Sequence, residues 1–252
     1  MAEPSIRFEG VSKSFGGQMV LKNLSLDVAP GEFLTIIGRS GCGKTTALRL
    51  VNGLLSPDTG RVLVQGKDVA QADPVALRRG IGYAIQSVGL FPHLTVEKNI
   101  AYVPSISGLE GWKGRERREK AGALLERVGL DRSLAGRYPR SLSGGQRQRV
   151  GIARALAAGP EILLMDEPFG AVDEITRSQL QDELLSLHQA SGITVLFVTH
   201  DIGEALRLGT RTLVLEAGEA QQYAPPSEIL NGPATPFVEE LVCRSRVFQA
   251  RA

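Results

Sequence analysis

The sequence contains few cysteines and no long apolar run, and both absences narrow the possible classes of protein. Among its 252 residues only Cys42 and Cys243 are cysteines, which argues against a disulfide framework and favours a reducing compartment. No apolar run approaches the length of a membrane span, and residues 1–5 lack the character of a signal peptide. We therefore expect a cytoplasmic protein unless a partner holds it at a membrane.

A strong excess of charge and internal repetition are also missing. The chain has 29 Lys and Arg against 27 Asp and Glu, a formal net charge of +2, so nothing suggests a nucleic-acid-binding tail or an acidic tail. No internal repeat or low-complexity tract is present. The length suffices for one large domain or for a domain with an insertion.

A glycine-rich stretch follows an apolar, strand-like run at residues 32–37 and precedes a helix-like run at residues 47–52. This context is what a G-x-x-x-x-G-K-[ST] match requires of a phosphate-binding loop. Glycines let backbone N–H groups turn toward a phosphate, and the helix start adds unpaired N–H groups and the positive end of its dipole. The loop residues are Gly38, Arg39, Ser40, Gly41, Cys42, Gly43, Lys44, Thr45 and Thr46.

Two side chains of this loop have predicted roles in phosphate chemistry. Lys44 supplies a cation for the β- and γ-phosphates, and the hydroxyl of Thr45 can ligate Mg²⁺. The alternative is a glycine-rich turn with an exposed lysine. For Cys42 we favour a small residue that fits the loop over a redox role.

Phe15 and Gln86 are candidates on weaker grounds. Phe15 precedes the turn at Gly16 and Gly17, where its ring could stack on a nucleotide base or could belong to the core. Gln86 ends the apolar strand expected at residues 81–85. Its amide could ligate a metal or hold a water, although a glutamine at a strand end usually faces solvent.

Residues 87–160 are predicted to form a largely helical insertion. Thr95 is a candidate N-cap for a helix over residues 96–101, and apolar residues recur at helical spacing over residues 121–128. The charged run at residues 113–120 is most simply a solvated helix face.

A second anion site is predicted near the end of this insertion. A serine and two glycines precede a run with helical period at residues 147–156. They therefore lie at a helix N-terminus, where N–H groups and the dipole favour an anion. The chain therefore has two predicted anion sites, but only the loop at residues 38–46 is large enough for a nucleotide. We expect the second site to bind the nucleotide of another subunit. The residues are Leu142, Ser143, Gly144, Gly145 and Gln146.

Two carboxylates end an unbroken apolar run at residues 161–165, which is typical of a buried strand. Ligands bind at the carboxyl ends of strands in open α/β sheets. Asp166 would therefore hold Mg²⁺ through water, and Glu167 would polarise an attacking water. The alternative, a pair that merely faces solvent, is less favoured beside a phosphate-binding loop.

His200 ends another apolar strand, expected at residues 193–199. A lone histidine is more often structural, but its place at the same expected sheet edge as Gln86, Asp166 and Glu167 favours function. A hairpin across Ala217 and Gly218 and two short helical pieces are expected in the rest of the chain.

Together these motifs resemble the ATP-binding subunit of an ABC transporter, in the same order and over nearly the whole chain. The resemblance makes Phe15 the aromatic A-loop residue, residues 38–46 the Walker A loop and residues 142–146 the unchanged LSGGQ signature. It assigns catalysis to Glu167, His200 and Gln86, the metal to Thr45, Gln86 and Asp166, and the D-loop to Asp173.

The resemblance implies an α/β fold with a P-loop NTPase core of ABC type, an antiparallel β subdomain and a helical signature-motif subdomain. One ABC ATPase domain would occupy residues 1–252. Its core would lie at about residues 1–86 and 161–224, the helical subdomain at 87–160 and a helical tail at 225–252. No regulatory domain of the CBS type is expected.

The same resemblance implies ATP and Mg²⁺ as cofactors and an ATPase coupled to transport of a solute. Two subunits would form a head-to-tail homodimer or pseudo-dimer with each ATP between Lys44 of one chain and Ser143 of the other. The segment near residues 86–99 would grip a coupling helix of an integral membrane permease, which receives solute from a binding protein. The subunit would lie peripherally on the cytoplasmic face of the membrane, with no nucleic-acid partner.

A finer resemblance is to the importers of quaternary amines such as glycine betaine, choline and carnitine. It is carried by residues 81–93, 175–184 and 237–240. Val172 and Glu174 depart from the usual Leu and Pro of the family. The alternatives are an importer of another small polar solute (a sulfonate or a polyamine), an exporter, and a soluble ABC ATPase outside transport. The last is less favoured because the chain has one cassette and no sustained heptads.

Overall fold

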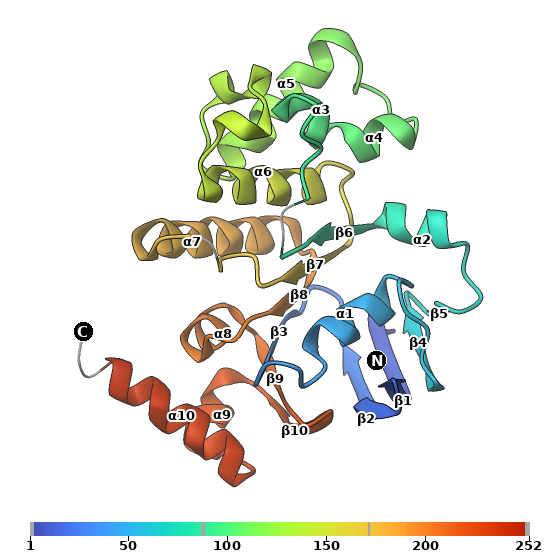
Figure 1. Ribbon diagram of the computed structural model, residues 1–252, viewed down its shortest axis with the longest axis vertical. Coiled ribbons are helices and arrows are strands. Elements are labelled where there is room, and N and C mark those ends of the chain that lie inside the picture. The colour runs from blue at the N-terminus through green and yellow to red at the C-terminus, as the bar shows by residue number, and fades with distance from the viewer. Residues whose placement is uncertain (1–2, 87–88, 171, 250–252) are drawn as a thin grey trace. The chain divides into compact units, whose positions relative to one another are not determined.

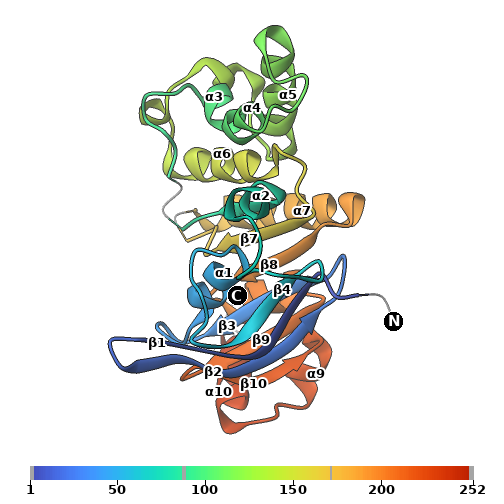
Figure 2. The same cartoon turned by 90° about the vertical axis from the view of Figure 1, so that its right-hand side faces the viewer.

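The structure is a computed structural model that describes residues 3–86, 89–170 and 172–249 (Figures 1 and 2). The chain forms two compact units. The first unit comprises Met1–Leu77 and Thr194–Ala252, and the second comprises Arg78–Ile193.

An antiparallel sheet in the first unit has the strand order β2-β1-β4-β5. Its strands are β1 (Ile6–Phe15), β2 (Gln18–Val28), β4 (Thr59–Val64) and β5 (Lys67–Asp68). The strands β1 and β2 run side by side as a long hairpin (Figure 2). Register irregularities between Phe8 and Ser14 interrupt the pairing of β1 with β2, so the apolar alternation of β1 does not continue along its whole length.

The other strands of the first unit pair in the order β10-β9-β3-β8. The strand β3 (Phe33–Gly38) is parallel to β8 (Thr194–Val198) and to β9 (Arg211–Glu216), whereas β10 (Glu219–Ala224) is antiparallel to β9. Strands that are covered on both faces read as continuous apolar runs, which is why β3 and β8 were recognisable. The predicted hairpin across Ala217 and Gly218 is confirmed.

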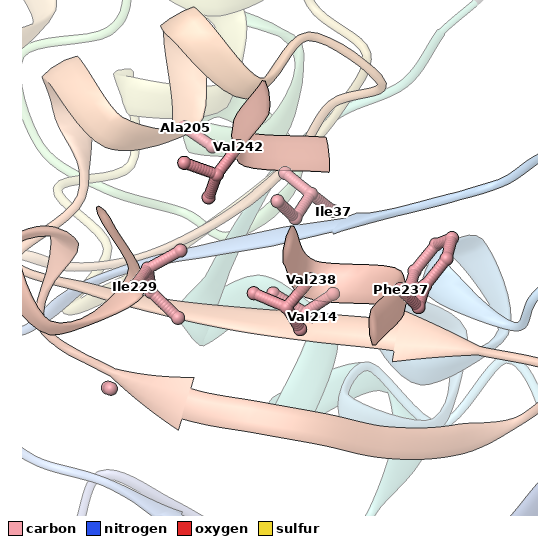
Figure 3. Packing of buried hydrophobic residues seen from close by; sticks show 8 residues of the cluster. Ile37, Ala205, Val214, Ile229, Phe237, Val238 and Val242 are labelled. Carbon is pink, nitrogen blue, oxygen red and sulfur yellow. The ribbon is translucent and has the colours of Figure 1, made fainter. Parts of the chain in front are cut away.

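Four helices accompany these strands within the described part of the first unit: α1 (Lys44–Val51), α8 (Ile202–Leu208), α9 (Pro226–Asn231) and α10 (Pro236–Gln249). Figure 3 shows α10 placing Phe237, Val238 and Val242 in a buried cluster with Ile37 of β3 and Val214 of β9. The predicted helical tail is thus part of the core of this unit.

The second unit contains two parallel strands, β6 (Ile81–Ala84) and β7 (Ile162–Asp166). Its helices are α3 (Val96–Ile100), α4 (Tyr102–Ile106), α5 (Gly114–Arg127), α6 (Gly144–Leu156) and α7 (Glu174–Ser191), with the 3-10 turns η1 (Arg132–Gly136) and η2 (Pro139–Ser141). The helix α2 (Pro74–Gly80) leads into it and was not predicted, because it has no buried face to produce an apolar period.

Residues 87–160 are largely helical where the structure describes them, as the sequence predicted, although residues 87 and 88 lie outside the described part. The unit also takes in β7 and α7, which the sequence division assigned to the core. The division into core, helical subdomain and tail therefore stays a prediction.

The segment before α3 is held by Asn99 rather than by the predicted cap. Thr95 occupies the N-cap position, but its hydroxyl makes no capping bond. The amide of the fully buried Asn99 instead donates to the carbonyl oxygens of Phe91, Leu94 and Thr95 at 3.0 to 3.1 Å and accepts from the Phe91 amide at 2.7 Å. The side chain of Asn99 thus fixes the backbone of residues 91–95, which lead into α3.

No described helix combines the length and the apolar character that crossing a membrane requires.

Candidate nucleotide-binding site

The phosphate loop leaves β3 at Gly38 and enters α1 at Lys44. Gly43, the N-cap of α1, has φ of 105°, a left-handed conformation. A Cβ atom there would lie 2.6 Å from Leu21 Cδ2 and 2.7 Å from the carbonyl oxygen of Val20. Glycine is therefore required at position 43 both by the backbone conformation and by the close approach of β2.

The ammonium group of Lys44 lies inside the loop. The residue is only 6% exposed, and its Nζ donates to the carbonyl oxygens of Gly38 at 2.8 Å and Arg39 at 3.1 Å. The carbonyl of Arg39 also accepts from the backbone amide of Cys42 at 3.2 Å. The loop thus closes around a buried cation, while Arg39, Ser40 and Gly41 at its tip are exposed. Such a loop presents amides and a positive charge to an anion.

Cys42 packs beneath the loop. Its side chain is buried, and a Cβ on Gly38 would lie 2.6 Å from its Sγ. Burial raises the pKa of the Cys42 thiol above its ordinary value, against the opposing charge of Lys44. The thiol therefore stays protonated near neutral pH, as expected of a small residue that fills space.

Phe15 ends β1 and is 46% exposed, with the ammonium of Lys13 5.5 Å from the centre of its ring. This exposure excludes the alternative of a core phenylalanine. A solvent-facing ring remains available to stack on a planar group.

Gln86 and Glu167 meet in the second unit. In the parallel pairing of β6 with β7, Ala84 lies opposite Met165, so the residues two positions beyond this pair come together. The side-chain amide of Gln86 donates from Nε2 to Oε2 of Glu167 at 3.0 Å. Glu167 has φ of 46°, which is uncommon for a residue with a side chain. The buried carboxylate of Asp166 ends β7 just before it.

The signature residues form the start of α6. Ser143 is the N-cap, and its hydroxyl accepts from the backbone amide of Gln146 at 3.2 Å. The side chain of Gln146 accepts in return from the Ser143 amide at 3.0 Å, completing a capping box. Leu142 is buried. The predicted helix N-terminus, with Gly144 and Gly145 in its first turn, is confirmed.

Asp173 caps α7 in the same manner. Its Oδ1 accepts from the backbone amide of Thr176 at 3.0 Å, and hydrogen bonds from Thr176 hold the pKa of this carboxyl below its ordinary value. The helix begins at Glu174, directly after this cap. The neighbouring Val172 is buried, and its Cγ1 would lie 4.0 Å from a Cβ on Gly145. Asp173 thus follows a residue, Val172, that lies beside the signature turn.

His200 is exposed in the first unit, two residues after the end of β8. The next residue, Asp201, caps α8 by accepting from the amides of Gly203 at 2.7 Å and Glu204 at 3.2 Å. The hydroxyl of Thr199 donates to the buried carboxylate of Glu204 at 2.6 Å. His200 is therefore held between two fixed neighbours, and the pair Thr199–Glu204 that fixes them was not singled out in the sequence.

The structure places the sequence-predicted residues in both units. The phosphate loop, Phe15 and His200 belong to the first unit, whereas Gln86, the signature turn, Asp166, Glu167 and Asp173 belong to the second. Sequence reasoning missed Asn99, whose only signal is a polar residue between the apolar positions Val96 and Ile100. It also missed the side-chain contacts of Arg39, for which no local pattern exists.

Comparison with protein families gives a match to the model described as ABC transporter over residues 21–170. The glycine betaine/carnitine/choline transport ATP-binding protein OpuCA of Bacillus subtilis (strain 168) is 47% identical over 98% of this chain and 64% of its own length. The glycine betaine uptake system ATP-binding protein YehX of Escherichia coli (strain K12) is 45% identical over 96% of this chain and 78% of its own. The chain thus spans 64% of the length of OpuCA.

A solved structure supports the same grouping. It is a dimeric structure of a post-hydrolysis state of an ATP-binding cassette bound to ADP and Pi. It superposes with a TM-score of 0.81 at 35% identity, over 88% of this chain and 98% of that one. The predicted fold class, α/β with a P-loop core, is confirmed.

Proposed function

The chain belongs to the ABC transporter family, and from that premise we propose that it is the ATP-hydrolysing subunit of an importer for quaternary amines such as glycine betaine or choline. The observation that carries the ATPase part is the phosphate loop closed around the buried Lys44. The solute is inferred from OpuCA and YehX, whose names state glycine betaine among what they transport.

ATP would bind with its phosphates in the loop of residues 38–46. The Lys44 ammonium, now held by two backbone carbonyls, would exchange these partners for β- and γ-phosphate oxygens. The exposed ring of Phe15 would stack on the base. Thr45, Asp166 and Gln86 carry the hard oxygen donors that suit Mg²⁺, which would neutralise phosphate charge when bound.

Hydrolysis would depend on Glu167 and its neighbour Gln86. A carboxylate that orients and polarises water needs a fixed position, and the hydrogen bond from Gln86 supplies one. His200, held between Thr199 and Asp201, completes the proposed catalytic residues.

The signature turn would act on the nucleotide of a second copy of this chain. The Ser143 hydroxyl accepts from Gln146, which leaves its own proton to donate. With the amides of Gly144 and Gly145, it would face the γ-phosphate held by Lys44 of the partner. An isologous homodimer makes this contact at two symmetry-related sites, one for each bound nucleotide. Asp173 would lie at the same interface.

The remaining partner would be a permease in the membrane. The chain would lie peripherally on the cytoplasmic face, and the segment near residues 86–99, braced by Asn99, would receive a coupling helix. A solute-binding protein would deliver the amine. A sulfonate or a polyamine is the alternative solute.

The test is uptake of labelled glycine betaine, choline and carnitine by cells that lack this subunit. We expect uptake to be lost, restored by the wild-type chain and by the surface control Glu110→Gln, and not restored by Lys44→Ala. Unchanged uptake of all three amines in cells without a redundant carrier would refute the solute assignment. ATP hydrolysis by the purified chain would then decide separately whether the ATPase assignment stands.

A further inference from the structure

Arg39 lies in the phosphate loop, but its side chain contacts the C-terminal helix α10. Its Nη2 donates to Oε2 of Glu240 at 3.1 Å, and its guanidinium carbon lies 5.1 Å from the centre of the Phe237 ring. Its Nη1 is also 3.7 Å from Oε1 of Glu216, at the end of β9. One side chain of the loop is thus attached to a helix 201 positions farther along the chain.

The backbone of Arg39 is the point on which the loop closes. Its carbonyl oxygen accepts both the Cys42 amide, at 3.2 Å, and the Lys44 ammonium, at 3.1 Å. A displacement of Arg39 would therefore move the buried cation and the amides of the loop together.

The helix that holds Arg39 is itself firmly packed. Val238 and Val242 of α10 are buried against Ile37 and Val214 (Figure 3). Ile37 is the residue before Gly38, so α10 contacts both the strand that leads into the loop and the first side chain of its tip. Phe237 and Glu240 are three positions apart and so share one face of the helix.

We propose that Phe237 and Glu240 are positioning residues that preorganise the phosphate loop through Arg39. This inference rests on the proposed binding of ATP. A loop already held in its binding conformation loses less entropy when the nucleotide arrives, so the contact raises nucleotide affinity. The side chains of Arg39 and Glu240 are 61% and 43% exposed. Exposed ion pairs are weak and are screened by salt, so the effect is a few-fold and depends on ionic strength.

The first experiment measures the dissociation constant of the purified full chain for Mg-ADP by calorimetry. At low ionic strength Glu240→Gln should bind about two- to fivefold more weakly than wild type. The matched control Glu239→Gln, an exposed carboxylate on the same helix, should bind normally. In about 1 M salt the Glu240→Gln and wild-type constants should converge, because the screening length falls to about 3 Å.

Two further variants separate the contact from a general loss of stability. Phe237→Leu keeps an apolar side chain in the cluster but removes the ring beside Arg39, and it should also weaken binding. A chain with both Arg39→Gln and Glu240→Gln should bind no more weakly than Arg39→Gln alone, since the two residues act through one another. Additive losses, or a loss that persists unchanged in high salt, would overturn the proposal.

A readout without nucleotide distinguishes this inference from the proposed function. Cys42 is buried in the same loop, and Cys243 is exposed on α10. With Glu240→Gln, alkylation of Cys42 in the nucleotide-free chain should become about two- to fivefold faster, because the loop opens more often. The rate at Cys243 should stay the same. If the alkylation rate of Cys42 is unchanged in Glu240→Gln, the positioning role of Phe237 and Glu240 is refuted, whether or not the chain binds Mg-ADP. If the wild type fails to bind Mg-ADP, that result counts against the proposed function alone.

Discussion

The side-chain amide of Gln86 donates a hydrogen bond to the carboxylate of Glu167 at 3.0 Å, joining the ends of the neighbouring strands β6 and β7. The bond holds the carboxylate of Glu167 through its Oε2 atom. A fixed carboxylate of this kind would suit the proposed role of Glu167 in orienting a water.

Glu167→Gln should lower ATP hydrolysis by about 10²- to 10⁴-fold while leaving ATP binding intact. The substitution keeps the shape of the side chain but removes its capacity to accept a proton. Measuring phosphate release and nucleotide binding on the same preparation tests both the slower hydrolysis and the unchanged ATP binding. Glu110→Gln, the same change at an exposed position of the second unit, serves as the control. Hydrolysis at the wild-type rate would remove Glu167 from its assigned role.

Ser143 combines a structural and a proposed chemical role, and two substitutions separate them. Ser143→Ala removes the N-cap of α6 and should lower the free energy of unfolding by about 1 kcal/mol. Ser143→Asp retains a capping acceptor, so its stability should stay near that of wild type. Its negative charge would nevertheless repel a phosphate and should prevent ATP-dependent dimerisation. Urea denaturation and light scattering with ATP measure the two effects. A Ser143→Asp chain that still dimerises with ATP would refute the contact with the partner's nucleotide.

Asn99→Ala should destabilise the chain by about 3 kcal/mol, because buried backbone groups of residues 91–95 would lose their partners. Urea denaturation measures the change in the free energy of unfolding. Lys98→Gln, at the exposed neighbouring position, should change it by less than about 0.5 kcal/mol. Equal stabilities of the Asn99 and Lys98 variants would show that the side chain does not brace this segment.

Cys42 should react with alkylating agents far more slowly than Cys243 at neutral pH. Burial raises the pKa of the Cys42 thiol above its ordinary value, so at any given pH less of it is thiolate than of an ordinary cysteine. Its reaction should accelerate as the pH rises beyond that value. Mass spectrometry of the two peptides from one sample gives both rates. ATP should protect Cys42, and alkylated chains should no longer bind ATP. Normal binding by the modified chain would contradict the placement of Cys42 beneath the phosphates.

The sequence was most informative where function demands particular residues at fixed spacing. The phosphate loop, the helix that starts at Ser143 and the meeting of Gln86 with Glu167 follow from glycine geometry, capping and the rule that strand ends share an edge. In the structure the glycine-rich loop leads into α1, Ser143 is the N-cap of α6, and the amide of Gln86 donates to Glu167.

What could not be foreseen depends on distant parts of the chain or on irregular geometry. The contact of Arg39 with Glu240 joins residues with no shared pattern, and α2 lacks an apolar face. The extent of β1 was hidden by its register shifts. Periodicity detects regular burial, and each of these features departs from it.

The backbone of Glu167 has an evolutionary consequence. A residue with a side chain at φ of 46° is held in a sparsely populated conformation that costs on the order of 1 kcal/mol, and glycine would adopt it freely. Selection for a sturdier chain should therefore favour Glu167→Gly, and selection for turnover should oppose it. If Glu167→Gly raises the urea midpoint and abolishes phosphate release, the φ angle of residue 167 is a point where stability is traded for catalysis. If the urea midpoint does not rise, the backbone at this position is unstrained.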